Sequence, residues 1–228
     1  VIAFAIPILC VSRYQFIFAV VLAVFTYMAV EPKLHPAVIP GMVAAILPVY
    51  VILTIARSHD VTYLTGIFEM KYEKMPIFIS QPYIYIANNY ENFNEMVINL
   101  PKFSLGIRGL FPLWTLSGLK FFVPSLIYYP IYVTKAELTT LTMFYDSYYD
   151  FGVFGVIFFA CLLGALAYLL VVKLREMQNP MGYLLYAQIA VYFMLSFFTT
   201  WFSNPTTWFY LILTGVMAVF YGMRAHRR

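Results

Sequence analysis

The chain has 228 residues, of which 63% are hydrophobic, 20% aromatic and only 11% charged, with a formal net charge of +4. Soluble domains are about 45–50% apolar and about 25% charged, so this composition excludes a disordered or collagen-like chain and disfavours a water-soluble enzyme. It predicts an all-α, polytopic helical bundle in a membrane.

A spanning helix needs about 20 consecutive, mostly apolar residues. In chain order, the stretches that approach or meet this length cover residues 15–30, 37–56, 153–172, 182–200 and 207–223. Residues 1–11 resemble the end of another span, so we expect five full spans plus a truncated one. Because Val1 already lies in this apolar stretch, we expect the chain to be the C-terminal part of a longer protein.

Basic residues in short connections indicate the cytoplasmic side of a membrane protein. With five alternating spans, the connection at 31–36, the link after residue 172 and the tail at 224–228 fall on one side, and all three carry lysine or arginine. The chain then divides into N-terminal spans (1–56), a large outward-facing loop (57–152) and three C-terminal spans with a basic cytoplasmic tail (153–228).

The outward-facing loop is long, and loops of this length are usually functional. It starts with a charged amphipathic stretch at 60–74, continues with an Asn- and Tyr-rich segment at 81–90, and then becomes apolar with Pro and Gly at 103–133. We expect it to contain amphipathic helices in the membrane interface or re-entrant helices.

Three arginines fall on the outward side: Arg13, Arg57 and Arg108. A guanidinium group stays charged and binds phosphate oxygens through two parallel hydrogen bonds, so these residues are candidates for holding a lipid diphosphate. Arg13 and Arg57 also fit anchors that extend from helix ends to the membrane surface. Arg108 differs, because apolar residues and glycines surround it.

A second candidate group precedes the span at 153–172. Asp146 and Asp150 are four residues apart and share a face if this segment is helical, and Tyr145, Tyr148 and Tyr149 surround them. Carboxylates accept hydrogen bonds from sugar hydroxyls, tyrosine rings stack on sugars, and one carboxylate can act as general base for an attacking hydroxyl. Asp150 also fits the simpler role of a negative charge at a helix N-terminus.

His59 lies at the start of the loop and is the third candidate for the base. It has no neighbouring His or Cys with which to build a metal site, and the sequence contains no nucleotide-binding or metalloprotease motif. We therefore expect neither a metal nor another cofactor, and no nucleic-acid partner.

The segment Tyr145-Asp-Ser-Tyr-Tyr-Asp-Phe-Gly-Val-Phe-Gly155, together with Ser12-Arg13 on an outward turn and the long outer loop, resembles the Wzy-type O-antigen and oligosaccharide repeat-unit polymerases. The resemblance implies a metal-independent glycosyltransferase in the bacterial inner membrane with its active site facing the periplasm or exterior. Its substrate would be an undecaprenyl-diphosphate-linked oligosaccharide, and membrane lipid, a chain-length regulator and a flippase would be its partners.

The same resemblance implies that the arginines bind the diphosphate, Arg13 above all. Two alternatives stay open. An O-antigen ligase would transfer the glycan to a lipid A core and typically carries a histidine in the large loop. A transporter or non-catalytic scaffold would show broken helices at matching positions of two halves, and only the helix containing Pro40 and Pro48 is broken in this way.

Overall fold

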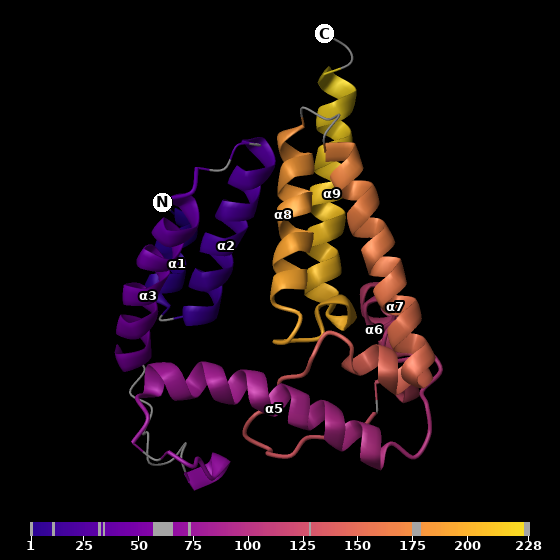
Figure 1. Ribbon diagram of the computed structural model, residues 1–228. Helices are drawn as coiled ribbons and strands as arrows, with labels where there is room; N and C mark the ends of the chain where they lie inside the picture. The colour runs from indigo at the N-terminus through magenta and orange to yellow at the C-terminus, as the bar shows by residue number, and fades with distance from the viewer. Residues whose placement is uncertain are drawn as a thin grey trace. The chain divides into compact units, whose positions relative to one another are not determined.

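The computed structural model describes residues 2–10, 12–31, 33, 35–56, 66–72, 74–127, 129–174 and 179–225 (Figure 1). Regular structure in these ranges is helical, without a strand, as the sequence predicts. The helices are α1 (Ile2–Leu9), α2 (Arg13–Val30), α3 (Val38–Ala56), α5 (Ile77–Asn99), α6 (Phe111–Leu116), α7 (Tyr145–Leu174), α8 (Pro180–Met194) and α9 (Pro205–Ala225), with 3-10 turns η1 (Leu119–Phe121), η2 (Pro124–Leu126) and η3 (Trp201–Ser203).

Among the described residues, three helical segments are long and apolar enough to cross a membrane: Val38–Ala56, Tyr145–Lys173 and Pro205–Met223. They coincide with three of the five predicted spans. The other two are shorter than a full span here: the apolar part of α2 covers Tyr14–Val30, and α8 has 15 residues. The structure therefore supports a multi-pass membrane protein with three candidate spans.

The chain forms two compact units, Val1–Ile84 and Tyr85–Arg228, with the boundary inside α5. In the first unit, α2 packs against both α1 and α3. Large apolar side chains of α3 are half or more exposed, Ile52 at 62% and Ile55 at 65%, which suits a helix surrounded by lipid tails. The predicted three-part division describes topology across a membrane and stays a prediction.

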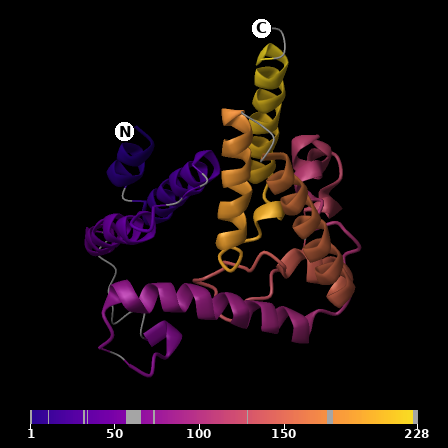
Figure 2. The same ribbon diagram turned by 45° about the horizontal axis from the view of Figure 1, so that its top comes forward.

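In the second unit, α8 packs against both α7 and α9, and the part of α5 that belongs to this unit runs across the ends of these helices (Figures 1 and 2). Polar contacts join α8 and its N-cap to α9. The Gln188 side chain donates to the Thr214 hydroxyl (3.0 Å), and the Asn179 amide donates to the carbonyl of Ala218 (2.8 Å). Such pairs satisfy polar groups that have no water to bind.

Buried asparagines on α5 fix the loops around it. Asn92 donates to the carbonyls of Leu138 (3.1 Å) and Thr140 (3.0 Å) and accepts from the backbone N–H of Thr134 (2.9 Å). Asn88 adds a bond to the same Leu138 carbonyl (3.2 Å). The Asn-rich stretch of the sequence is thus a helix whose side chains hold residues 134–140 in place.

Helix α8 ends at Met194, six residues before the predicted end of that span. The carbonyls that follow are used by other parts of the chain: Leu195 accepts from the Trp201 indole (2.8 Å), Ser196 from the N–H of Met143 (2.7 Å) and Phe197 from Asn89 (2.6 Å). Residues 195–200 therefore leave the helix, and their carbonyls bond to α5 and to the segment that precedes α7.

Helix α7 contains a sharp kink. Phe151 and Gly152 depart from helical dihedrals, and Gly152 has φ 62° and ψ −146°, a region essentially restricted to glycine. The kink separates a short first segment, which carries the Tyr and Asp residues, from the long apolar segment that begins at Val153, where the sequence predicts the span to start.

Candidate functional site

The candidate site is built around Arg108, in the turn between α5 and α6. Its Nε donates to Oδ1 of Asp146 at 2.6 Å, and the two side chains are only 14% and 6% exposed. The guanidinium carbon lies 4.6 Å from the centre of the Tyr149 ring and 5.5 Å from that of Tyr145. A cation held by a carboxylate and two aromatic faces is fixed in place.

Asp150 holds the turn that carries this arginine. Its carboxylate accepts hydrogen bonds from the Ser104 hydroxyl and from the backbone N–H groups of Arg108 (3.1 Å) and Gly109 (2.7 Å). The backbone adds two further bonds, from the Ser104 N–H to the Tyr149 carbonyl (3.1 Å) and from the Leu105 N–H to the Asp150 carbonyl (3.2 Å). The Asp150 side chain is thus used to fix the loop.

Glycines make this close approach possible. A Cβ at Gly109 would lie 2.8 Å from Oδ2 of Asp150, and a Cβ at Gly155 would lie 2.1 Å from the carbonyl oxygen of Ser147. Gly106 has φ 95° and lies beside the Phe151 ring. The Asp-Phe-Gly-x-x-Gly sequence therefore has a structural role. Its glycines allow the start of α7 to fold back, and its aspartate, Asp150, binds the Arg108 turn.

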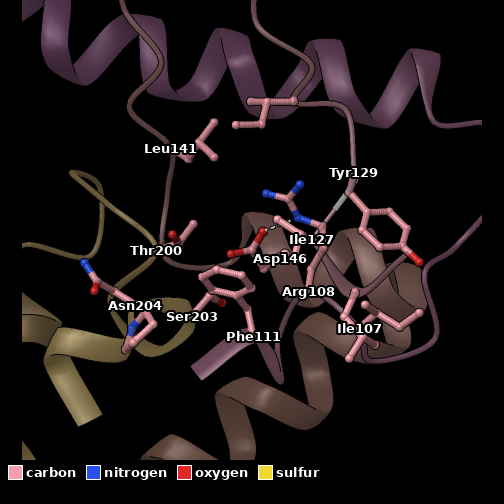
Figure 3. A pocket seen from close by; sticks show the side chains of 13 residues that line it. Ile107, Arg108, Phe111, Ile127, Tyr129, Leu141, Asp146, Thr200, Ser203 and Asn204 are labelled. Carbon is pink, nitrogen blue, oxygen red and sulfur yellow. Dashed lines mark hydrogen bonds and ion pairs between the residues drawn. The ribbon is translucent and has the colours of Figure 1, made fainter. Parts of the chain in front are cut away.

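Arg108 and Asp146 line a cavity of about 450 Å³ (Figure 3). Most of its wall is apolar, from Ile107, Phe111, Leu126, Ile127, Ile131, Leu141 and Pro205, with Tyr129 at one side. Thr200, Ser203 and Asn204 add hydroxyl and amide groups to the opposite side, across from Arg108 (Figure 3). The second carboxylate oxygen of Asp146 points away from the ion pair, toward the side of the cavity where Thr200 lies (Figure 3).

The three predicted sugar-binding tyrosines are placed differently from one another. Tyr145 and Tyr149 are buried (0% and 3% exposed) in a cluster with Met96 and Leu141. The Tyr145 hydroxyl accepts from the N–H of Tyr132 (2.9 Å) and donates to its carbonyl (3.1 Å). These two rings support Arg108 and leave no open face for a sugar.

Tyr148 is half-buried, and its ring packs edge-on against Phe93 and Phe103. Among the described tyrosines, Tyr129 lines the cavity, and it is not among the predicted site residues. Its only signal is its position in the apolar, Pro- and Gly-rich part of the loop.

The other predicted residues stay predictions. Arg57 and His59 lie outside the described residues, and the side chain of Arg13, at the start of α2, does as well. Among the three predicted arginines, Arg108 is thus the one whose side chain is described. Within the described part of the chain, no group of three or more His, Cys, Asp or Glu side chains is placed to hold a metal ion.

No protein-family model, no curated protein and no solved structure matches this chain. Among the described residues, the Arg108–Asp146 contact uses only Nε of the guanidinium and Oδ1 of the carboxylate. The other nitrogens and oxygen, with the nearby hydroxyl and amide groups, suit an anionic, hydroxyl-rich ligand.

The polar side of the cavity is not among the predicted site residues either. Thr200, Ser203 and Asn204 belong to a segment predicted to be the end of one span and a short outward turn. Asn204 and its neighbours come to the cavity because α8 ends early and η3 turns the chain toward α9. A Ser/Asn/Pro cluster between two spans is the only signal that the sequence offers.

Proposed function

We propose that this protein polymerises lipid-linked oligosaccharide repeat units on the outer face of the bacterial inner membrane, as Wzy-type polymerases do. It transfers a glycan from undecaprenyl diphosphate to the non-reducing end of another lipid-linked repeat unit. The observation that carries the proposal is the Arg108–Asp146 pair in a cavity at the N-terminal ends of two candidate spans, α7 and α9.

Arg108 binds the diphosphate of the donor. Its Nε is committed to Asp146, which leaves Nη1 and Nη2 for phosphate oxygens. The leaving group is a lipid diphosphate, so the main task is to stabilise negative charge as the sugar–phosphate bond breaks. Arginine performs this task without changing its own protonation state.

Asp146 acts on the acceptor sugar. An acceptor hydroxyl oxygen attacks the anomeric carbon of the donor glycan, the bond from that carbon to the diphosphate oxygen breaks, and undecaprenyl diphosphate leaves. The hydroxyl proton passes to the free oxygen of Asp146, which faces the cavity. A carboxylate within hydrogen-bond reach of the hydroxyl is the usual general base for this step.

Asp150 has a different role in this proposal, although its residue type alone also suits a base. Both of its oxygens accept hydrogen bonds from the Arg108 turn, so we assign it to positioning Arg108. Thr200, Ser203 and Asn204 bind sugar hydroxyls on the far side of the cavity. The proposal also keeps the predicted roles of Arg13, Arg57 and His59. It further includes five full spans and contact with a flippase or chain-length regulator.

The test uses the full chain in lipid nanodiscs, with undecaprenyl diphosphate as the binding probe and glycan length in producing cells as the activity readout. Arg108→Ala should weaken binding by about tenfold or more, since a charge-assisted pair of bonds is lost, and should abolish long glycans. Lys102→Ala, an exposed cation in the same connection, is the matched control and should change neither.

Asp146→Asn separates binding from chemistry. The asparagine oxygen can still accept from the arginine Nε, and loss of the Asp146 charge makes the cavity more positive, so undecaprenyl diphosphate binding should be at least as tight as in the wild type. Glycan chains should shorten to single repeat units because the amide cannot take the proton. Long glycans in both Arg108→Ala and Asp146→Asn cells would refute the proposal.

A further inference from the structure

Helix α6 separates two hollows. On one side, Arg108 and Phe111 line the cavity described above. On the other side is a second hollow of about 270 Å³, formed by the turn, α6 and the first turns of α9. We call it the α6–α9 groove; its walls include Gly109, Leu110, Leu113, Leu116, Trp208 and Ile212.

The α6–α9 groove is apolar and open. Leu110, Leu113 and Leu116 are 49–53% exposed, and Ile212 on the opposite wall is 54% exposed. The one polar side-chain atom among its lining residues, the Trp208 indole nitrogen, donates to the Phe202 carbonyl at 2.6 Å. Since α9 is a candidate span, the groove opens where lipid tails would lie.

The two hollows are linked by consecutive residues. Arg108 lines the cavity and Gly109 lines the groove, and Asp150 binds the backbone N–H of both. A ligand with an anionic head at Arg108 therefore has an apolar surface one short helix away. That combination of a cation and an adjoining apolar groove fits an amphiphile with a negatively charged head and a hydrocarbon chain.

We propose that the α6–α9 groove receives the first isoprenoid units of the lipid diphosphate whose head binds at Arg108. This inference rests on the proposed function, from which it takes the identity of the donor, and it adds the route by which the chain leaves the site. The chain passes around α6 and enters the bilayer beside α9.

The substrate chain fits the groove better than a bilayer phospholipid does. The lining residues of the groove carry no charge that would hold a phospholipid head, whereas the cation lies in the adjoining cavity. A diphosphate held at Arg108 fixes the start of its own chain close to Gly109. The groove then contributes affinity through apolar burial and orients the anomeric carbon toward Asp146.

Two substitutions fill the groove from opposite walls, Leu113→Trp on α6 and Ile212→Trp on α9. Leu162→Trp, at a 44% exposed position of α7, is the matched control for a larger side chain on a lipid-facing surface. The full chain in nanodiscs is titrated with farnesyl diphosphate and with inorganic diphosphate, and each titration is repeated with excess phosphatidylglycerol.

Each methylene group of the ligand that can no longer be buried in the groove weakens binding roughly fourfold. Leu113→Trp and Ile212→Trp should therefore raise the Kd of farnesyl diphosphate by about tenfold and leave that of inorganic diphosphate unchanged. Leu162→Trp should alter neither Kd. A photoreactive farnesyl diphosphate should label residues 110–116 and 208–212 of the wild-type protein, a measurement that requires no substitution.

Three results would overturn the inference. The first is an unchanged Kd of farnesyl diphosphate in both tryptophan variants, and the second is labelling confined to α7. The third is displacement of farnesyl diphosphate by phosphatidylglycerol, which would make the groove a site for bilayer lipid. In all three cases binding of inorganic diphosphate that depends on Arg108 would leave the proposed function standing. If the wild-type protein binds neither diphosphate, the proposed function fails, and this inference fails with it.

Discussion

Replacing Asp150 by asparagine tests whether this carboxylate positions Arg108. Asp150 accepts from the Ser104 hydroxyl, from the N–H of Arg108 at 3.1 Å and from the N–H of Gly109 at 2.7 Å. Asparagine keeps the shape of the side chain but has one oxygen and one amino group that can only donate. With its oxygen in the position of Oδ1, the amino group faces the Gly109 N–H, and two donors meet.

The expected loss follows from these three bonds. A buried N–H left without an acceptor costs about 1–3 kcal/mol, and hydrogen bonds to a charged group are stronger than neutral ones by about 1 kcal/mol each. One lost bond and two weakened bonds together lower the free energy of unfolding by about 3–5 kcal/mol. Ser104→Ala removes a single bond to the carboxylate and should cost about 1.5–3 kcal/mol.

The assay is unfolding of the full chain in mixed micelles at increasing denaturing detergent. Ser117→Ala is the control, because the Ser117 hydroxyl is exposed and bonds within its own helical turn, to the Leu113 carbonyl; it should change stability by less than about 0.5 kcal/mol. Wild-type stability in Asp150→Asn would refute the positioning role. If that variant were also unable to make long glycans, Asp150 would instead be the base.

The glycines and asparagines of the fold give further predictions. Gly152→Ala should destabilise the protein by about 1–3 kcal/mol, since its backbone conformation is open mainly to glycine. Gly164→Ala, where a Cβ meets no atom within 4 Å, should be neutral or stabilising in the same detergent-unfolding assay. Gly155→Ala should prevent the start of α7 from folding back and abolish Arg108-dependent binding of undecaprenyl diphosphate, whatever its effect on stability. Asn92→Ala removes four hydrogen bonds of a fully buried side chain and should cost about 2–4 kcal/mol. Asn99→Ala, on the exposed end of the same helix, should cost less than about 0.5 kcal/mol; equal losses in the two variants would contradict the role of Asn92 in holding residues 134–140.

The sequence predicts the features that depend on composition and local order. Mean hydropathy identifies the helices around residues 37–56, 153–172 and 207–223, because a spanning helix must be apolar along its whole length. The four-residue spacing of Asp146 and Asp150 correctly places both on the side of α7 that meets the Arg108 turn. Arg108 stands out for a local reason, its apolar neighbours and two adjoining glycines.

The sequence does not reveal contacts between residues that are far apart in the chain. Asp150 and Gly109 are 41 residues apart, and nothing local indicates that one carboxylate would bind a remote backbone turn while its neighbour binds a side chain. The same limit applies to Tyr145 and Tyr149: a tyrosine suits a sugar site by residue type, but its burial is set by α5 and by residues 129–133 packing over it. The early end of α8 also depends on remote donors.

The two carboxylates of the site differ in how their charges are balanced. Asp150 is satisfied by a hydroxyl and two backbone N–H groups, so its charge does not draw on Arg108. Asp146 does pair with Arg108, and the pair together carries no net charge. A diphosphate that enters the cavity therefore meets donors but little net positive potential, and neutralising it requires another cation. Arg13 and Arg57 are the other arginines that the sequence predicts on the outward side, and a double Arg13→Ala, Arg57→Ala variant tests the expectation that they bind diphosphate: it should lose glycan polymerisation even with the Arg108 turn intact.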